Sequence, residues 1–256
     1  MHPILYYILF FIALGGIGMA IANRKVGVTV RRQRWIKYFT YILFTGLVLL
    51  SIFLHFFNWL SLFIVAVAFF ELVKVNLAEP SLSKIKIVFS ILVFIILASG
   101  FILFARTFNY SFLLFIYFQV QVFDGFCQIT GQLFGKKRLA PKISPSKTVE
   151  GLVGGWLCCV IAGCLAANWL ETSSAFYAGV FGLIAGIFTG LTSFSGDLLA
   201  SYYKRKAQVK DYSNWLPGQG GFLDRFDSLL MTGAVYYLLY IIFFKDTFHG
   251  FINIAE

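Results

Sequence analysis

Long apolar runs constrain the fold of this chain more than any other feature of its sequence. Eight runs lie at about residues 3–22, 38–56, 59–78, 87–105, 110–127, 152–170, 175–196 and 228–244. Unbroken apolar stretches of about 18–20 residues are typical of membrane-spanning helices, whereas the strands of a membrane barrel alternate over about ten residues. Of the 256 residues 59% are hydrophobic, which is more than a soluble domain can bury. The sequence therefore predicts an all-α polytopic membrane protein with about eight transmembrane helices.

The lysines and arginines indicate how these helices are oriented. Segments 23–37, 74–86, 128–150 and 204–225 hold 6, 3, 5 and 5 of them, and the other side holds Arg106 and Lys245. Basic residues stay on the cytoplasmic side of membrane proteins, so the split of 19 to 2 predicts an N-terminus outside the membrane. The expected location is the inner membrane of a bacterium. The same placement explains the net charge of +10 without a nucleic acid partner.

One polar stretch, residues 196–228, lies between the last two apolar runs. Asp197 ends the seventh run, and Asp224 and Asp227 stand on one face of the helix expected to follow. Carboxylates crowded into a poorly solvated site repel one another, and Mg²⁺ takes carboxylate and phosphate oxygens together. The stretch also holds bases for phosphate and glycines for close approach, among them Lys204, Arg205, Lys210, Gly218, Gly220 and Gly221. The pattern indicates phosphoryl or nucleotidyl transfer, and the alternative is a solvated charged loop.

A second polar segment begins at Asp124, at the inner end of the fifth run. An ionised carboxylate there is either wetted at the interface or functional, and both interpretations stay open. In Ser144-Pro-Ser-Lys-Thr-Val-Glu150, we expect Ser146 to cap a helix opening near Lys147. Free N–H groups at a helix start suit an anion, although most such stretches are only turns before helices. The connector at 74–86 offers no comparable cluster.

These two polar segments resemble a known family. The stretch Ser201-Tyr-Tyr-Lys204-Arg205, followed by Lys210-Asp211 and Gly220-Gly221-Phe-Leu-Asp224-Arg225-Phe-Asp227, is similar to the signature of phosphatidate cytidylyltransferases, also called CDP-diacylglycerol synthases. Residues 139–151 look like the family's second recurrent block, and Asp124 matches an acid shortly before it. The resemblance is strong over roughly residues 110–245, and before them it rests on hydropathy alone.

The resemblance implies a reaction of CTP with phosphatidic acid that gives CDP-diacylglycerol and pyrophosphate. It implies a paired-metal centre that includes Mg²⁺, with a monovalent second ion, held by Asp197 and Asp224 and with Asp124 as a further candidate. The catalytic residues that it implies are Asp197, Asp224, Asp227 and Lys210. Those near the substrates are Ser144, Lys147, Thr148, Ser201, Lys204, Arg205, Asp211, Gln219, Gly220, Gly221 and Arg225. We therefore expect one integrated membrane domain, with N-terminal helices over 1–109 and a catalytic region over 110–256.

The chain departs from the family pattern at Gln219, where the family has a histidine. Glutamine keeps a donor and an acceptor but carries no charge near neutral pH. A phosphate monoester is already largely dianionic at pH 7, so the nucleophile needs no base and we expect a working enzyme. Two alternatives stay open: a different lipid phosphate, such as a polyprenyl phosphate, and a family member of reduced activity.

Other functions and assemblies are less favoured. A transporter also places acids at membrane depth, but this chain has no evident inverted repeat and its polar groups crowd one end of the helices. Membrane lipids are expected partners. Small residues at Gly182, Gly186 and Gly190 favour close helix packing, and a homodimer stays open. The four cysteines lie in apolar runs without metal-type spacing, so they are expected to be buried and unpaired.

Overall fold

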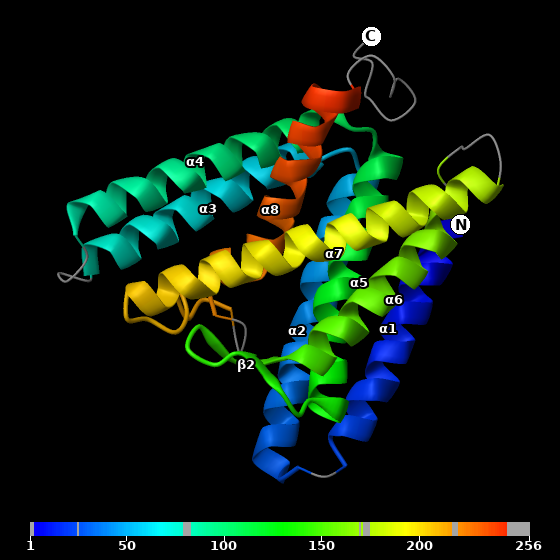
Figure 1. The fold of residues 1–256 in the computed structure, drawn as a ribbon, viewed down its shortest axis with the longest axis horizontal. Helices are drawn as coiled ribbons and strands as arrows, with labels where there is room; N and C mark the ends of the chain where they lie inside the picture. The colour runs from blue at the N-terminus through cyan, green and yellow to red at the C-terminus, as the bar shows by residue number, and fades with distance from the viewer. Residues whose placement is uncertain are drawn as a thin grey trace. The chain divides into compact units, whose positions relative to one another are not determined.

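The structure is a computed structural model that describes residues 3–24, 26–78, 83–168, 170, 175–216 and 220–244. In that part of the chain, eight helices are long and apolar enough to cross a membrane. They are α1 (Pro3–Ala22), α2 (Val28–Phe53), α3 (Phe57–Ala78), α4 (Lys84–Thr107), α5 (Tyr110–Phe134), α6 (Val149–Ala167), α7 (Ala175–Lys206) and α8 (Leu223–Leu239) (Figure 1). A π-helical turn, η1 (Tyr240–Phe244), continues α8. The predicted helical membrane architecture is confirmed.

The helices form two compact units, and neither is a continuous stretch of sequence. The first comprises Met1–Thr45 and Leu114–Leu191, and the second Gly46–Leu113 and Thr192–Glu256. Helices α2, α5 and α7 contribute residues to both. The expected partition into 1–109 and 110–256 concerned which part carries catalysis, and it stays a prediction.

In the first unit, helices approach one another closely at small residues. Gly163 of α6 and Gly182 of α7 face each other, and a Cβ on either would meet the other's backbone. Trp156 Nε1 donates to Ile187 O at 2.9 Å and joins the same two helices. The glycine spacing in the seventh apolar run therefore serves helix packing within the chain.

A small β-hairpin in the first unit joins α5 to α6. Strand β1 (Arg138–Ala140) pairs antiparallel with β2 (Ser144–Thr148), with Arg138 opposite Thr148 and Ala140 opposite Ser144. The prediction that Ser146 caps a helix opening near Lys147 is wrong, because 144–148 is a strand and α6 begins at Val149. Thr148 is the cap: its side-chain oxygen accepts from Gly151 N at 3.1 Å. Pairing of 144–148 with β1 explains the difference, and Pro145 favours the extended backbone of Ser144 before it.

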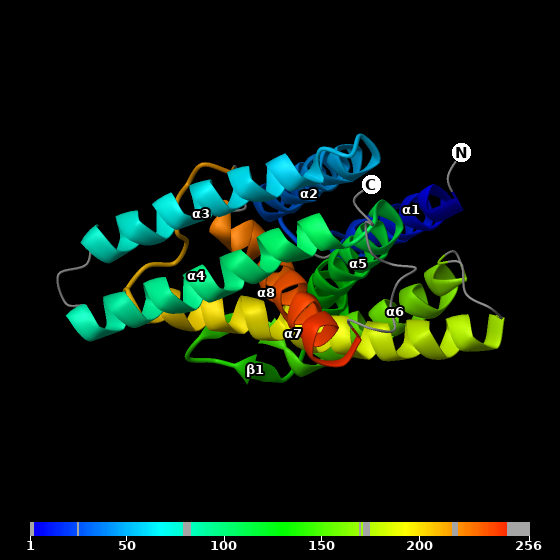
Figure 2. The ribbon, with the colours of Figure 1, turned by 90° about the horizontal axis from the view of Figure 1, so that it is seen from above.

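In the second unit, α3 and α4 run side by side, and α8 packs on α4 (Figures 1 and 2). Gly100 of α4 lies so close to α8 that a Cβ on it would be 2.8 Å from the Ala234 Cβ. Buried hydroxyl groups join α7 to α8: Thr232 Oγ1 lies 3.0 Å from Thr192 Oγ1 and 3.2 Å from Ser193 Oγ. These contacts fix how α7 and α8 meet, and both helices carry predicted site residues.

Candidate active site

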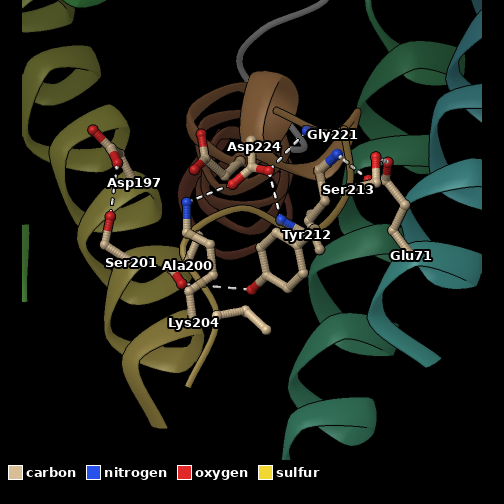
Figure 3. A network of polar contacts seen from close by, with 12 residues as sticks. Glu71, Asp197, Ala200, Ser201, Lys204, Tyr212, Ser213, Gly221 and Asp224 are labelled. Carbon is tan, nitrogen blue, oxygen red and sulfur yellow. Dashed lines mark hydrogen bonds and ion pairs between the residues drawn. The ribbon is translucent and has the colours of Figure 1, made fainter. Parts of the chain in front are cut away.

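The first turn of α8 carries a buried carboxylate whose oxygens are densely hydrogen-bonded. Asp224 Oδ2 accepts from Tyr212 N and Gly221 N, both at 2.8 Å, and Oδ1 forms an ion pair with Lys204 Nζ (Figure 3). The side chains of Lys204 and Asp224 are only 10% and 5% exposed. Burying two charges is costly unless further hydrogen bonds satisfy them, and two backbone N–H groups do so here. Around Lys204 and Asp224, the polar stretch is therefore an organised charged site and not a solvated loop.

Lys204 lies among the acids that the sequence singled out. It interacts electrostatically with Asp227 and Asp197 as well as with Asp224. Asp197 lies two turns earlier on α7, where its Oδ1 accepts from Ser201 Oγ at 3.3 Å. The structure thus gathers the three predicted acids around one buried lysine.

A close approach of two helix backbones brings Asp197 and Asp227 into this cluster. Gly196 of α7 faces α8 so closely that a Cβ on it would lie 2.6 Å from Asp227 O and 2.7 Å from the Met231 Cβ. Each helix carries its acid at or next to this contact. Glycine at position 196 therefore sets the spacing between the two acidic segments.

Tyr212 forms one wall of the charged cluster. Its ring is buried, and Lys204 Nζ lies 5.6 Å from the ring centroid. Its hydroxyl donates to Ala200 O at 3.5 Å. Burial raises the pKa of the Tyr212 phenol well above its usual value, and the nearby carboxylates of Asp227 and Asp224 act in the same direction. The phenol is therefore neutral at physiological pH and adds no charge to the cluster.

The glycines of the signature approach Asp224 closely. Gly220 has a φ of +83°, which side-chain-bearing residues rarely adopt, and a Cβ on it would lie 2.7 Å from Asp224 Oδ2. Gly221 is buried and its N–H is bonded to the same oxygen. Gln219, the residue that departs from the family pattern, lies outside the described residues.

The remaining predicted residues of this stretch lie at the edge of the cluster. Arg205 and Lys210 are exposed, and Arg205 Nη1 donates to Val209 O at 3.0 Å. Asp211 and Arg225 are half-buried. Helix α7 continues to Lys206, well beyond its apolar run, so Lys204 reaches the acids from a helix and not from a loop. The structure places Lys204 at the centre and Lys210 outside, and a catalytic role for Lys210 stays a prediction.

Sequence reasoning missed Glu71, a fully buried acid on α3. Its Oε1 accepts from Ser213 Oγ at 2.6 Å, next to the residue whose N–H binds Asp224 (Figure 3). An ionisable residue within an apolar run was the available signal. It went unused because the partners of Glu71 are more than 140 positions away in the sequence.

The predicted residues of the second block lie in the first unit, on and around the β-hairpin. Ser144 and Thr148 are buried, and Lys147 is half-buried. Glu150 secures the hairpin, because its Oε2 accepts from Lys136 N at 2.9 Å and its Oε1 from Lys137 N at 3.2 Å. The block is therefore a folded element that opens a helix, and two N–H groups at that opening already have acceptors: Val149 N donates to Lys137 O and Gly151 N to Thr148 Oγ1.

Asp124 also belongs to the first unit. It is half-buried on α5, ten residues before the end of that helix at Phe134. Its neighbour Gly125 faces Tyr41, since a Cβ there would lie 3.4 Å from the Tyr41 hydroxyl oxygen. The predicted role of Asp124 as a further metal ligand stays a prediction.

The donor set of the charged cluster suits a hard cation. In the part of the chain that the structure describes, no group of three His, Cys, Asp or Glu side chains is close enough to hold an ion by itself. Mg²⁺ needs no such cage, because one or two carboxylates with substrate phosphates and water commonly hold it. Asp224 receives three hydrogen bonds at its two oxygens, which leaves about one lone pair for a cation. The residues therefore fit a magnesium ion that arrives together with a phosphate substrate.

Fold and site together define a polytopic integral membrane protein with a charged cluster at the ends of two of its helices. Its sequence pattern over residues 2–243 is that of the cytidylyltransferase family, and the chain belongs to this family. The resemblance stated from the sequence is confirmed at that level.

Several relatives of known name share part of the sequence. Over 133 residues the chain is 37% identical to the phosphatidate cytidylyltransferase of Haemophilus influenzae, covering 52% of this chain and 46% of that protein. Over 131 residues it is 40% identical to the phosphatidate cytidylyltransferase of Aquifex aeolicus, covering 51% and 47%. It is also 40% identical over 107 residues to the uncharacterized protein YnbB of Escherichia coli, covering 42% and 35%. The matches thus span about half of these relatives or less.

Proposed function

We propose that the protein transfers the cytidylyl group of CTP to phosphatidic acid, giving CDP-diacylglycerol and pyrophosphate. Membership of the cytidylyltransferase family and the names of the relatives from Haemophilus influenzae and Aquifex aeolicus support this activity. Those names also favour phosphatidic acid over a polyprenyl phosphate. No feature of the described residues favours a transporter.

The observation that carries the proposal is the buried ion pair of Lys204 with Asp224, beside Asp197 and Asp227. A phosphate oxygen of phosphatidic acid attacks the α-phosphorus of CTP, and the bond from that phosphorus to the bridging oxygen breaks as pyrophosphate leaves. The attacking phosphate is already largely dianionic, so no side chain has to remove a proton. What the protein must supply is alignment of the two phosphates and positive charge around the reacting phosphorus.

Within this scheme, Lys204 is the buried cation that faces the phosphate charge. Arg205, Lys210 and Arg225 lie towards the surface of the cluster, where they bind the outer phosphates of CTP. Gly220 and Gly221 belong to the scheme as the residues whose missing side chains let the Asp224 and Glu71 carboxylates approach the backbone beside the substrates. In the first unit, Ser144, Lys147 and Thr148 are the further substrate-binding side chains of the scheme, and Lys147 supplies a positive charge for phosphate.

Magnesium is the cofactor that we propose, held by Asp197 and Asp224 together with phosphate oxygens. When bound, the ion neutralises charge on the α-phosphate and on the departing pyrophosphate. Asp224 is oriented for this role by the N–H groups of Tyr212 and Gly221. A monovalent second ion and Asp124 as a further ligand belong to the same proposal.

The distribution of basic residues supports an orientation in which this site faces the cytoplasm of a bacterium, at the inner membrane. CTP then reaches the site from the cytoplasm and phosphatidic acid from the inner leaflet. A homodimer is compatible with the proposal, but the reaction does not require one.

The test is a transfer assay on the purified protein in detergent. The protein is incubated with Mg²⁺, α-labelled CTP and, separately, phosphatidic acid and polyprenyl phosphate. We expect labelled lipid with phosphatidic acid and release of unlabelled pyrophosphate. Label with polyprenyl phosphate alone would refute the lipid assignment, and label with neither lipid would refute the activity.

A further inference from the structure

The start of α8 lacks a cap of its own, and Glu71 of α3 replaces it. The N-cap residue is Phe222, whose side chain has no oxygen to accept a backbone N–H. Glu71 Oε1 accepts from Phe222 N at 3.0 Å, and Oε2 accepts from Leu223 N at 2.8 Å. A carboxylate at this place satisfies N–H groups that a helix leaves unpaired and is favoured by the helix dipole. The orientation of α8 at its first turn is thus tied to α3.

Glu71 and Asp224 hold neighbouring residues at two places in the chain. Tyr212 donates its N–H to Asp224, and Ser213, the next residue, donates its hydroxyl to Glu71. Gly221 donates its N–H to Asp224, and Phe222, the next residue, donates its N–H to Glu71. The two carboxylates therefore share the residue pairs 212–213 and 221–222, and neither pair can shift without affecting both acids.

The contact between Glu71 and this segment leaves no spare room. A Cβ on Gly221 would lie 2.5 Å from Glu71 Oε1 and 2.7 Å from Oε2. Glu71 itself is fully buried, so water does not compete for the hydrogen bonds of its carboxylate. Because the packing is so tight, a shift of the Glu71 carboxylate would also shift the backbone N–H groups that donate to Asp224.

We propose that Glu71 is a positioning residue for the active site: it fixes the 212–213 and 221–222 pairs, and so the direction in which Asp224 faces Lys204 and the phosphates. It acts through hydrogen-bonded backbone and touches no substrate. The inference rests on the proposed function for its catalytic consequence, whereas the anchoring itself is independent of that function.

The primary test is Glu71→Gln, which keeps the size of the side chain but places an N–H donor where an acceptor is required. Misplacing a catalytic group by about 1 Å costs about 100-fold in rate. We expect kcat per folded protein to fall about 10- to 100-fold, with the KM for CTP changed less than about threefold. Ser213→Ala removes one of the three hydrogen bonds and should lower kcat less than Glu71→Gln does.

A matched control lies on the same helix. Ser61 of α3 is fully buried, and its hydroxyl donates to Asn58 O at 2.7 Å within its own helix. Ser61→Ala therefore loses a buried hydrogen bond that has no connection with α8. Its kcat should equal that of the unmodified protein.

A fluorescence signal reports anchoring without activity. Trp215 N donates to Ser213 Oγ at 3.3 Å, and the Trp215 ring stacks on Phe70 with 5.9 Å between centroids. The emission of Trp215, obtained by subtracting the spectrum of Trp215→Phe in each background, should shift in Glu71→Gln and not in Ser61→Ala. A kcat of Glu71→Gln within twofold of the unmodified protein, or an unchanged Trp215 emission, would overturn the proposal.

Two further outcomes also bear on the proposal. If Glu71→Gln is not recovered folded, Gly221→Ala takes its place, because the new Cβ displaces the Glu71 carboxylate. An unshifted Trp215 emission in Gly221→Ala then overturns the proposal, and a shift with a lowered kcat supports it. If the unmodified protein labels no lipid, the proposed function fails, while the fluorescence comparison still decides whether Glu71 anchors this segment.

Discussion

At the scale of single residues, the charge balance around Lys204 governs both stability and the proposed transfer. Lys204 neutralises Asp224 directly and is attracted by Asp227 and Asp197. Breaking a buried ion pair by removing one partner costs about 3–5 kcal/mol, because the other charge stays buried. Removing the cation leaves three acids, whereas removing Asp224 leaves Lys204 with two other carboxylates. The two deletions should therefore differ in cost.

We predict that Lys204→Met destabilises the protein by about 3–5 kcal/mol and abolishes lipid labelling. Asp224→Asn should destabilise it less but abolish labelling equally. The double variant should be more stable than the sum of the two single losses predicts, because neither charge of the ion pair is then left buried without its partner. Thermal unfolding in detergent and the transfer assay provide the measurements.

The control is Lys206→Met, two residues along α7, where the lysine is exposed and lies 5.4 Å from the Tyr202 ring. An effect of Lys206→Met as large as that of Lys204→Met would contradict the assignment.

At this scale, the sequence could predict those residues whose charge differs from the apolar residues next to them in the chain. Asp197, Asp224 and Asp227 were predicted because acids next to apolar runs are costly and stand out. Glu71 was not, because its importance depends on residues 142 to 152 positions later that only the folded chain brings close. Which lysine is buried could not be predicted either, because Lys204 and Lys210 look equivalent in sequence, whereas in the structure Lys204 is buried on α7 and Lys210 is exposed beyond the end of that helix.

At the scale of elements, the crossing of α7 and α8 determines how the acids meet. Gly196→Ala would place a methyl group 2.6 Å from Asp227 O, a backbone atom that cannot rotate away. We predict a loss of stability of about 1–3 kcal/mol from overpacking, together with a lower transfer rate because Asp197 and Asp227 move apart. Gly179→Ala is the control on the same helix, since a Cβ there has no heavy atom within 4 Å. Equal unfolding midpoints for Gly196→Ala and Gly179→Ala would contradict this prediction, because they would show that α7 and α8 can move apart at Gly196 without loss of stability.

Helix number was predictable because bilayer thickness forces long apolar runs, but helix ends were not. Helix α7 runs on to Lys206, and α2 begins at Val28, ten residues before its apolar run. Hydropathy marks the part of a helix that lies in lipid, whereas capping and hydrogen bonding decide where it stops. The β-hairpin before α6 was not predicted for the same reason. It depends on hydrogen bonds from the backbone N–H groups of Lys136 and Lys137 to Glu150, which hydropathy does not indicate.

At the scale of the whole molecule, the distribution of lysine and arginine predicts that the basic connectors lie on one side of the membrane. Helix α4 offers a test within a single element, because Lys84 is its first residue and Arg106 lies at its other end, and both are exposed. They are 22 residues apart, a rise of about 33 Å, which matches a hydrocarbon core of about 30 Å. As a membrane-spanning helix, α4 has its two ends on opposite sides of the membrane.

We predict that Arg106 faces outward and Lys84 inward. In a variant without the four native cysteines, Arg106→Cys should react with a membrane-impermeant maleimide on intact spheroplasts, and Lys84→Cys only after permeabilisation. Both substitutions are tolerable at exposed ends, and removing Arg106 strengthens the charge asymmetry that sets the orientation. The opposite labelling pattern would place the Lys204 cluster on the side without CTP, and the proposed transfer from CTP would then have no substrate. Labelling of both positions before permeabilisation would mean that α4 does not span the bilayer, despite its length and composition.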